Sequence, residues 1–206
     1  MASDFQELEP GAMSVSDVYA WMIRAIVPRP IAWVSTCDAA GNRNLAPFSY
    51  FNGVCSAPPT IAFSVTNRSD GTQKDTVNNI ESIAEFVVNV VPVSLAQPMF
   101  ETATEFPPEI DEFDVAQLVG MPSQLVRPPR VALSPIHMEC RLDRIVRVGQ
   151  GPFAGNLILG QVVMLHVRRD VLDDRGKLDP AALDAIGRMG GLEYTRTRDR
   201  FRMSGS

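Results

Sequence analysis

Cysteine, histidine and long apolar runs are all scarce in this 206-residue sequence, which has three cysteines and two histidines. Cys37, Cys55 and Cys140 match neither a CxxC motif nor zinc-ligand spacing, and an odd count in a chain of this length indicates reduced thiols rather than a disulfide framework. No run approaches the ~20 apolar residues that cross a bilayer, and residues 1–13 lack the basic and apolar regions of a signal peptide. We therefore expect a cytoplasmic protein without a membrane segment.

The two histidines, His137 and His166, are not spaced as a metal pair, and each lies in an apolar strand pattern. We expect both to be structural, with His166 kept as a candidate for the catalytic site. The motifs GxSxG and HExxH are absent, and no Cys–His constellation is visible. Gly149-Gln150-Gly151 is superficially similar to a nucleotide-binding loop, but it precedes a strand rather than a helix and so indicates a hairpin turn. No metal site is predicted.

The composition is that of an ordinary globular chain, with 45% apolar and 21% charged residues. A net charge of −5 argues against a general nucleic-acid surface, which would be basic. The length predicts a single domain over residues 1–206, with an N-terminal extension at 1–13 and a C-terminal tail at 195–206. Arginines gather late in the chain, and we interpret them mainly as belonging to a solvated tail.

Hydrophobic periodicity predicts few helices and many strands. One helix is expected over residues 15–26, with Ser14 or Ser16 as N-cap, and a second begins with Thr72 as N-cap and Asp75 at N3. The predicted strands share β-branched or alternating residues and cover 31–37, 45–52, 60–66, 85–91, 130–148 and 156–169. Short helices are expected near 94–103 and 178–186, and the remainder of 94–127 is a mixed loop suited to a lid or a dimer arm.

At least six strands joined by short turns favour a closed or half-closed antiparallel barrel, because a parallel sheet would need a helix between most strands. The stretch over residues 28–52 contains a strand, a turn and a second run rich in amide, hydroxyl and aromatic groups. Pro47 in this run cannot donate a ladder hydrogen bond, so the run is unlike an ordinary central strand. It suits the wall of a flat ligand with polar edges.

Three segments carry a family resemblance: PRPIAWVST at 28–36, NLAPFSYFN at 44–52 and KDT..NI at 74–80. Together with weaker matches at 128–140 and 187–194, they resemble the flavin reductase-like, FMN-binding split-barrel family, particularly its flavoredoxin-like branch. The resemblance implies a mainly β, six-stranded antiparallel split barrel with a few peripheral helices. It also implies a homodimer that holds FMN at the subunit interface.

The start of the second predicted helix is the expected phosphate site. Free backbone N–H groups and the helix dipole favour an anion there, Lys74 adds a charge, Thr76 a hydroxyl and Arg68 a bidentate donor. Asp75 would repel a phosphate and is assigned to capping. Composition alone would favour an ordinary charged helix start, and it is the resemblance that implies FMN phosphate binding here.

The isoalloxazine ring needs small polar groups at its edge and an apolar wall on its face. The residues expected to bind the flavin share these properties or lie in the matching segments; they are Trp33, Ser35, Thr36, Asn44, Ala46, Pro47, Phe48, Ser49, Tyr50 and Asn52. A late segment near the flavin in the family adds Arg188 and Tyr194. From residue types alone, a half-buried strand pair would explain the main group equally well.

The resemblance implies an NAD(P)H:flavin reductase that passes hydride from nicotinamide to flavin N5, with FMN as cofactor and FAD as a second option. Such an enzyme can supply reduced flavin to a monooxygenase. The alternative is a flavoredoxin-like electron carrier with bound FMN, a redox-protein partner and no NAD(P)H turnover. Neither needs an acid–base residue, since the cofactor carries the chemistry.

Overall fold

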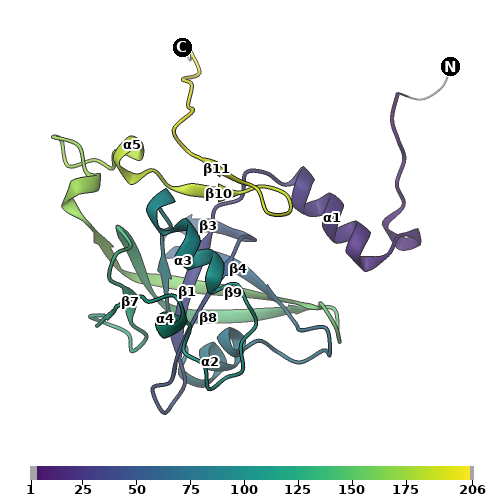
Figure 1. Ribbon diagram of the computed structural model, residues 1–206, viewed down its shortest axis with the longest axis horizontal. Helices are drawn as coiled ribbons and strands as arrows, with labels where there is room; N and C mark the ends of the chain where they lie inside the picture. Colours follow the sequence, from purple (N-terminus) through teal and green to yellow (C-terminus); the bar gives the residue numbers. More distant parts are fainter. Residues whose placement is uncertain (1–3, 205–206) are drawn as a thin grey trace.

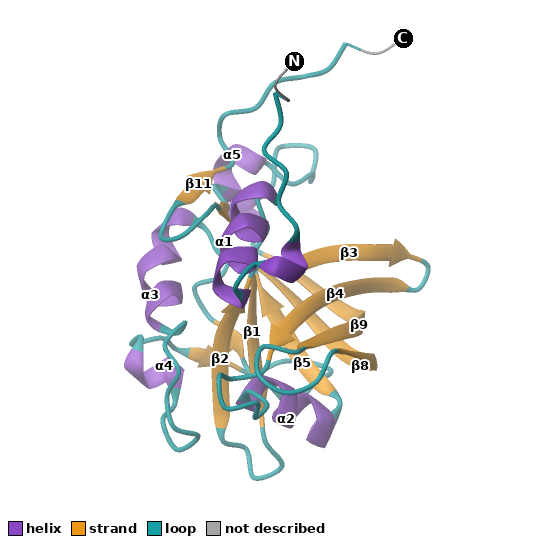
Figure 2. Cartoon of the chain, turned by 90° about the vertical axis from the view of Figure 1, so that its right-hand side faces the viewer, coloured by secondary structure: helices purple, strands orange, loops and turns teal. Residues whose placement is uncertain are grey.

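One curved antiparallel sheet forms the body of the molecule in the computed structural model, which describes residues 4–204. Its seven strands follow the spatial order β2-β1-β5-β8-β9-β4-β3 (Figures 1 and 2). Their bounds are β1 Ala32–Cys37, β2 Arg43–Phe48, β3 Phe51–Ser56, β4 Pro59–Thr66, β5 Glu85–Asn89, β8 Ile136–Val148 and β9 Gly155–Val167. The sheet curls until Phe48 of β2 meets Phe63 of β4, with ring centroids 5.5 Å apart. A mainly antiparallel, half-closed barrel is therefore confirmed.

Two short hairpins accompany the main sheet, one formed by β6 (Gly120–Met121) with β7 (Arg130–Val131) and one by β10 (Ile186–Arg188) with β11 (Tyr194–Arg196). The helices are α1 Val15–Ala25, α2 Asp75–Ile83, α3 Ala96–Glu101, α4 Glu112–Val115 and α5 Pro180–Leu183, with 3-10 turns at η1 Pro10–Ala12, η2 Val93–Leu95 and η3 Arg169–Val171. Helix α1 stands apart from the barrel beside the C-terminal segment (Figure 1). Among the described residues, no helix is both long and apolar enough to span a bilayer.

Strand β1 is buried on both faces and separates two parts of the core. Trp33 points into a cluster with Leu45 and Phe113, whereas Val34 points into a cluster with Phe63 and other barrel residues. Successive side chains of a strand alternate between faces, which explains this division. Strand β2 pairs with β1 at the edge of the sheet, and its Leu45 side chain is fully buried.

The single strand predicted over 45–52 is two strands in the structure. The chain bends at Ser49 and Tyr50, so β2 ends at Phe48 and β3 begins at Phe51 on the opposite edge of the sheet. This division adds the seventh strand to the six that were expected. Pro47 is tolerated because β2 is an edge strand, where a missing N–H breaks no ladder.

The N-terminus of α2 also differs from the prediction. Lys74 is the N-cap, not Thr72, because Asp70 accepts hydrogen bonds from both the backbone N–H and the hydroxyl of Thr72, at 2.8 and 2.6 Å. By contrast, Ser14 caps α1 as predicted, accepting from the Asp17 N–H at 3.1 Å.

Later elements follow the prediction with shorter bounds. The long strand expected over 130–148 is interrupted before Pro135, which leaves β7 and β8 as separate strands. The helix expected over 178–186 is limited to α5, and its last residues enter β10 instead. Of the two predicted terminal segments, residues 1–3 and 205–206 lie outside the described part of the chain.

Candidate functional site

A narrow pocket lies between the edge of β2, the start of α2 and the segment 102–106, and it is called here the β2–α2 pocket. Its volume is about 50 Å³. The pocket brings together seven of the residues predicted to bind the flavin: Asn44, Ala46, Pro47, Phe48, Arg68, Lys74 and Thr76. Strand β2, the loop after β4 and the first turn of α2 thus meet where the sequence placed one site.

The first turn of α2 supplies hydrogen-bond donors to this pocket. The N–H of Val77 donates to the Lys74 carbonyl at 2.9 Å, while the N–H groups of Asp75 and Thr76 donate to no described residue. Unpaired N–H groups at a helix start carry partial positive charge and favour an anion. The backbone itself is therefore part of the site.

Both cations of the pocket are paired with carboxylates. Lys74 Nζ lies 2.7 Å from Glu105, and Arg68 Nη2 lies 2.7 Å from Asp75. Arg68 also donates to the Gln73 carbonyl, which fixes its guanidinium against the loop. Asp75 therefore pairs with Arg68 rather than capping the helix, because no side-chain cap is made at this end of α2. An anionic ligand would compete with Glu105 and Asp75 for these two cations.

A chain of hydrogen bonds orients Thr76 at the pocket wall. Asn44 Nδ2 donates to the hydroxyls of Thr76 and Thr36, at 3.1 and 3.2 Å, and Asn79 donates to Thr36 at 3.1 Å. The Thr76 oxygen accepts in this chain, and no described residue accepts its hydroxyl hydrogen. Thr76 can therefore donate towards a ligand.

Glu112 is a pocket residue that sequence reasoning missed. It is 7% exposed, and its Oε2 accepts from the Leu45 N–H at 2.9 Å. Burial raises the pKa of this carboxyl, and the Leu45 N–H opposes the rise. With Leu45 held by Glu112 and Pro47 lacking an N–H, the free edge of β2 is closed to a further strand. No local pattern could have revealed this contact, since the two residues are 67 positions apart.

Three residues predicted to touch the flavin make structural contacts in the interior. Trp33 is fully buried and donates from Nε1 to the Thr102 hydroxyl at 2.9 Å, which anchors the segment that covers the pocket. Ser35 donates to the Pro129 carbonyl at 2.5 Å, and Thr36 accepts from two amides, both from fully buried positions. These three side chains satisfy interior groups and do not line the β2–α2 pocket, so their contact with a flavin stays a prediction.

The remaining predicted residues lie outside the lining of the β2–α2 pocket. Ser49 accepts from Arg29 Nε at 3.2 Å, and the Arg29 guanidinium lies 5.9 Å from the Tyr50 ring centre. Arg29 is 4% exposed and was missed from sequence, yet it joins α1 to the end of β2.

Arg188 and Tyr194 pair with each other, with the guanidinium 4.7 Å from the ring centre, in the β10–β11 hairpin beside Arg29. Asn52 lies on the exposed strand β3. None of these residues reaches the β2–α2 pocket in this chain.

His166 also lies away from the pocket. Its Nε2 is 2.6 Å from Oε1 of Glu139, a fully buried carboxylate that accepts from the N–H groups of Gln124 and Leu125 at 2.8 and 2.7 Å. Burial raises the pKa of Glu139, but these donors and His166 outweigh it and hold the pKa below its usual range. The contact with Glu139 favours a structural role for His166, and its catalytic role stays a prediction.

His137 is 4% exposed and its Nε2 lies 2.9 Å from the Val131 carbonyl, to which it donates. Its Nδ1 has no partner among the described residues. Burial lowers its pKa from 6.5 to about 4, so the ring is neutral at pH 7. In the described chain, no group of three His, Cys, Asp or Glu side chains is arranged to hold a metal ion.

The donor set of the β2–α2 pocket fits a phosphate monoester such as that of FMN. Two cations, two free N–H groups and the Thr76 hydroxyl surround the same space, which is the usual chemistry of a phosphate at a helix start. Pro47 and Phe48 continue the wall along β2 and offer apolar surface to a ring. Because the pocket is too small for a flavin ring while residues 102–106 cover it, the ring would lie beyond the phosphate along β2 or displace that segment.

Comparison with known proteins identifies one family for nearly the whole chain. The family model described as "Flavin reductase like domain" matches residues 23–194. An uncharacterized protein of Deinococcus radiodurans is 41% identical over 199 residues, covering 93% of this chain and 86% of that protein. The matched range contains every lining residue of the β2–α2 pocket.

Two solved structures share the whole architecture. Nitrilotriacetate monooxygenase component B from Bacillus cereus has a TM-score of 0.92 at 32% identity, and the match covers 98% of this chain and 100% of the Bacillus cereus chain. The 2-nitrobenzoate 2-nitroreductase NbaA of Pseudomonas fluorescens has a TM-score of 0.87 at 28% identity, covering 98% and 96%. Both solved structures therefore superpose on nearly the whole chain.

Proposed function

Because the chain belongs to the flavin reductase-like family, we propose that it binds FMN through the β2–α2 pocket and reduces it with NAD(P)H. The observation that carries this proposal is the phosphate cradle, where Lys74, Arg68 and the free N–H groups of α2 converge beside an edge strand. A fixed anion site at one end of a flat ligand determines where its ring lies.

The residues of the chain bind and orient rather than transfer protons. Lys74 and Arg68 neutralise the phosphate, Thr76 donates its free hydroxyl hydrogen, and Asn44 holds Thr76 in place. Pro47 and Phe48 form the apolar wall. Flavin bound in this way would supply the redox chemistry by accepting a hydride from nicotinamide. Holding donor and acceptor in contact can itself be worth on the order of 7–11 kcal/mol.

A homodimer is part of the proposal. Helix α1 exposes Tyr19, Trp21 and Met22, which are 55%, 51% and 45% exposed, and strand β3 is exposed along most of its length. Large apolar side chains grouped on one helix usually mark an interface. In such a dimer, Ser49, Tyr50 and Asn52 near β3, and Arg188 and Tyr194 near α1, would lie where two chains meet and complete a flavin site.

A monooxygenase partner is the third part of the proposed function. The solved neighbour from Bacillus cereus is named as component B of a monooxygenase. By analogy, this chain would release reduced flavin to a second protein that uses it with oxygen. The segment 102–111, which covers the pocket and reaches α4, is the surface we expect to change when flavin enters or leaves.

Anaerobic reduction tests the proposed activity. Purified protein is loaded with FMN, NADH or NADPH is added, and the absorption band of oxidised flavin is followed. Bleaching far faster than that of free FMN supports the reductase and names its donor. Binding without bleaching would instead indicate an electron carrier fed by another protein, and no binding of FMN would refute the site.

A further inference from the structure

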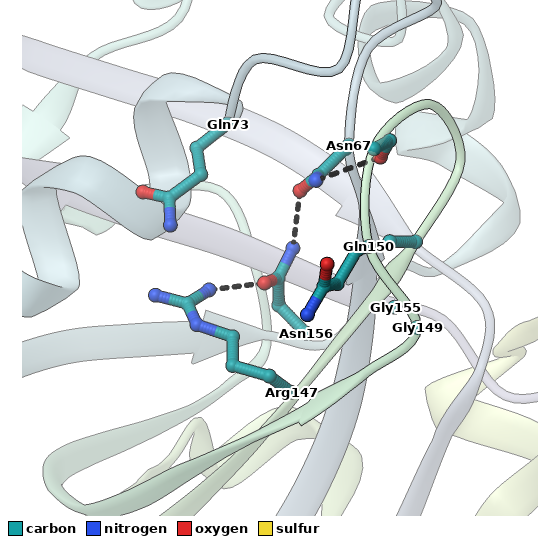
Figure 3. Close-up of a pocket in the computed structure, with 9 residues that line it drawn as sticks. Asn67, Gln73, Arg147, Gly149, Gln150, Gly155 and Asn156 are labelled. Atoms are coloured by element: carbon teal, nitrogen blue, oxygen red, sulfur yellow. Dashed lines mark hydrogen bonds between the residues drawn. The ribbon is translucent and has the colours of Figure 1, made fainter.

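A second cavity, called here the amide pocket, lies on the other side of the loop that precedes α2. It has a volume of about 630 Å³, and it is formed where this loop meets the β8–β9 hairpin. Its lining is rich in amides and glycines: Asn67, Gln73, Arg147, Gly149, Gln150, Gly151, Ala154, Gly155 and Asn156. Figure 3 shows the amides of Asn67, Gln150 and Asn156 turned towards one another, with Arg147 and Gln73 opposite.

Asn156 is the fixed base of this pocket. It is 3% exposed and donates to the Val65 carbonyl and to Asn67 Oδ1, at 2.9 and 2.8 Å, while its own oxygen accepts from Arg147. Asn67 in turn donates to the Gly151 carbonyl at 3.0 Å, which ties the hairpin to the loop. The cavity is thus held open by a hydrogen-bonded frame.

The pocket carries little net charge. Arg147 is its only charged lining residue, and the guanidinium also forms an ion pair with Glu81 of α2. A single paired cation gives a phosphate fewer charged contacts than the two cations and the free N–H groups of the β2–α2 pocket. The pocket therefore favours a neutral polar ligand over a second phosphate.

Several groups remain available to such a ligand. The Gln150 side chain has no hydrogen-bond partner among the described residues, nor do the backbone N–H groups of Gln150 and Gly151 donate to any of them. Amide side chains present a donor and an acceptor together, and this pairing matches the edge of a nucleobase, as when Asn or Gln binds adenine at N6 and N7. The chemistry points to a base edge.

The two pockets share one loop. Asn67 and Gln73 line the amide pocket, and their direct neighbours Arg68 and Lys74 line the β2–α2 pocket. Adjacent Cα atoms are about 3.8 Å apart, so the cavities lie on two sides of the same turn of chain. Gly71 of this loop would bring a Cβ to within 3.5 Å of Gly151, which shows how closely loop and hairpin approach each other.

We infer that the amide pocket receives the adenine of a dinucleotide whose phosphates lie at Lys74 and Arg68. The inference rests on the proposed function for its second half, because it places those phosphates in the cradle of the β2–α2 pocket. FAD carries this adenine, and its pyrophosphate can take the place proposed for the FMN phosphate, so FAD is the dinucleotide that fits both pockets. NAD(P)H has to meet a flavin whose phosphate already occupies the cradle, and it is not the ligand of the amide pocket. FMN lacks adenine and does not use this pocket.

Titration of ADP by calorimetry tests the pocket directly, without any redox activity. Gln150→Ala should lower the affinity for ADP about fivefold, as expected for one lost hydrogen bond. Ala154→Leu, which fills the cavity, should lower the affinity for ADP more. Gln124→Ala, an exposed glutamine elsewhere, serves as the control and should leave ADP affinity unchanged. Thermal unfolding of each variant verifies that it is folded.

Matched ligand pairs then identify the source of the adenine. FAD is compared with FMN, and NADH with its mononucleotide NMNH, in the wild type and both variants. A selective loss of FAD affinity supports the inference, whereas a selective loss of NADH affinity with FAD affinity unchanged would overturn it. If both variants bind ADP, FAD and NADH with the affinities of the wild type while FMN still binds, the inference is overturned and the proposed function stands. If FMN fails to bind, the proposed function falls, and the ADP titration alone decides for or against an adenine site.

Discussion

The β2–α2 pocket and the interior around Glu139 both gather ionisable side chains, but they satisfy them differently. Glu139 is fully buried and held by two backbone N–H groups and His166. Lys74 and Arg68 are partly exposed and paired with carboxylates that an anion can replace. Accessible charged side chains whose partners can be replaced therefore indicate a binding site, whereas buried charged side chains with a full set of hydrogen bonds indicate a role in stability.

Removing the buried carboxylate should have the largest effect. Glu139→Ala leaves the N–H groups of Gln124 and Leu125 unpaired, and we expect the free energy of unfolding to fall by about 3 kcal/mol. Denaturant titration measures it, and Glu139→Gln, which keeps one acceptor, should lose less. The affinity for FMN should not change in the folded protein. A large loss of FMN affinity with unchanged stability would mean that Glu139 serves binding rather than stability.

Acid should weaken the same interior through His137. Its folded pKa of about 4 lies below the unfolded 6.5, so the unfolded state binds the proton more readily and stability falls as the pH drops through this window. Between pH 7 and 5 the loss should be about 2 kcal/mol. His137→Gln, which keeps a donor for the Val131 carbonyl but does not titrate, should lessen this pH dependence, and an identical slope in the variant would contradict the assignment.

In the β2–α2 pocket, Lys74→Ala should lower the affinity for FMN at least tenfold, about 1.4 kcal/mol, because a charge-assisted contact to the phosphate is lost. Fluorescence titration measures it. Lys177→Ala is a matched control, since Lys177 is the only other lysine and lies exposed in a distant turn. Equal affinities in wild type and Lys74→Ala would remove Lys74 from the site.

The smallest effect should be a gain. Glu105→Gln frees Lys74 from its ion pair, and an exposed pair is typically worth 0.2–1 kcal/mol, so FMN should bind up to roughly fivefold more tightly. Stopped-flow mixing should also show a faster association. Glu109→Gln, a nearby exposed carboxylate, should leave both values unchanged. Weaker binding in Glu105→Gln would mean that Glu105 supports the ligand rather than competing with it.

Local patterns predicted most strands and the α1 cap, whereas the family resemblance, not a local pattern, implied that β2 and the start of α2 form one site. Local patterns could not predict that Ser49 and Tyr50 form a bend, because the residues on either side are both good strand formers. They also could not decide between a ligand wall and the core for the Trp33 ring, which is fully buried in the structure. Glu105 and Glu112 act on the pocket only through long-range folding, so no spacing in the sequence identifies them.

The direct test of the central claim is the ratio of FMN to riboflavin affinity, which isolates the phosphate. We predict that the wild type binds FMN at least tenfold more tightly than riboflavin. Lys74→Ala should abolish most of this preference, and Lys177→Ala should keep it. Equal binding of the two flavins by the wild type, or a preference that survives in Lys74→Ala, would contradict a phosphate cradle at the start of α2.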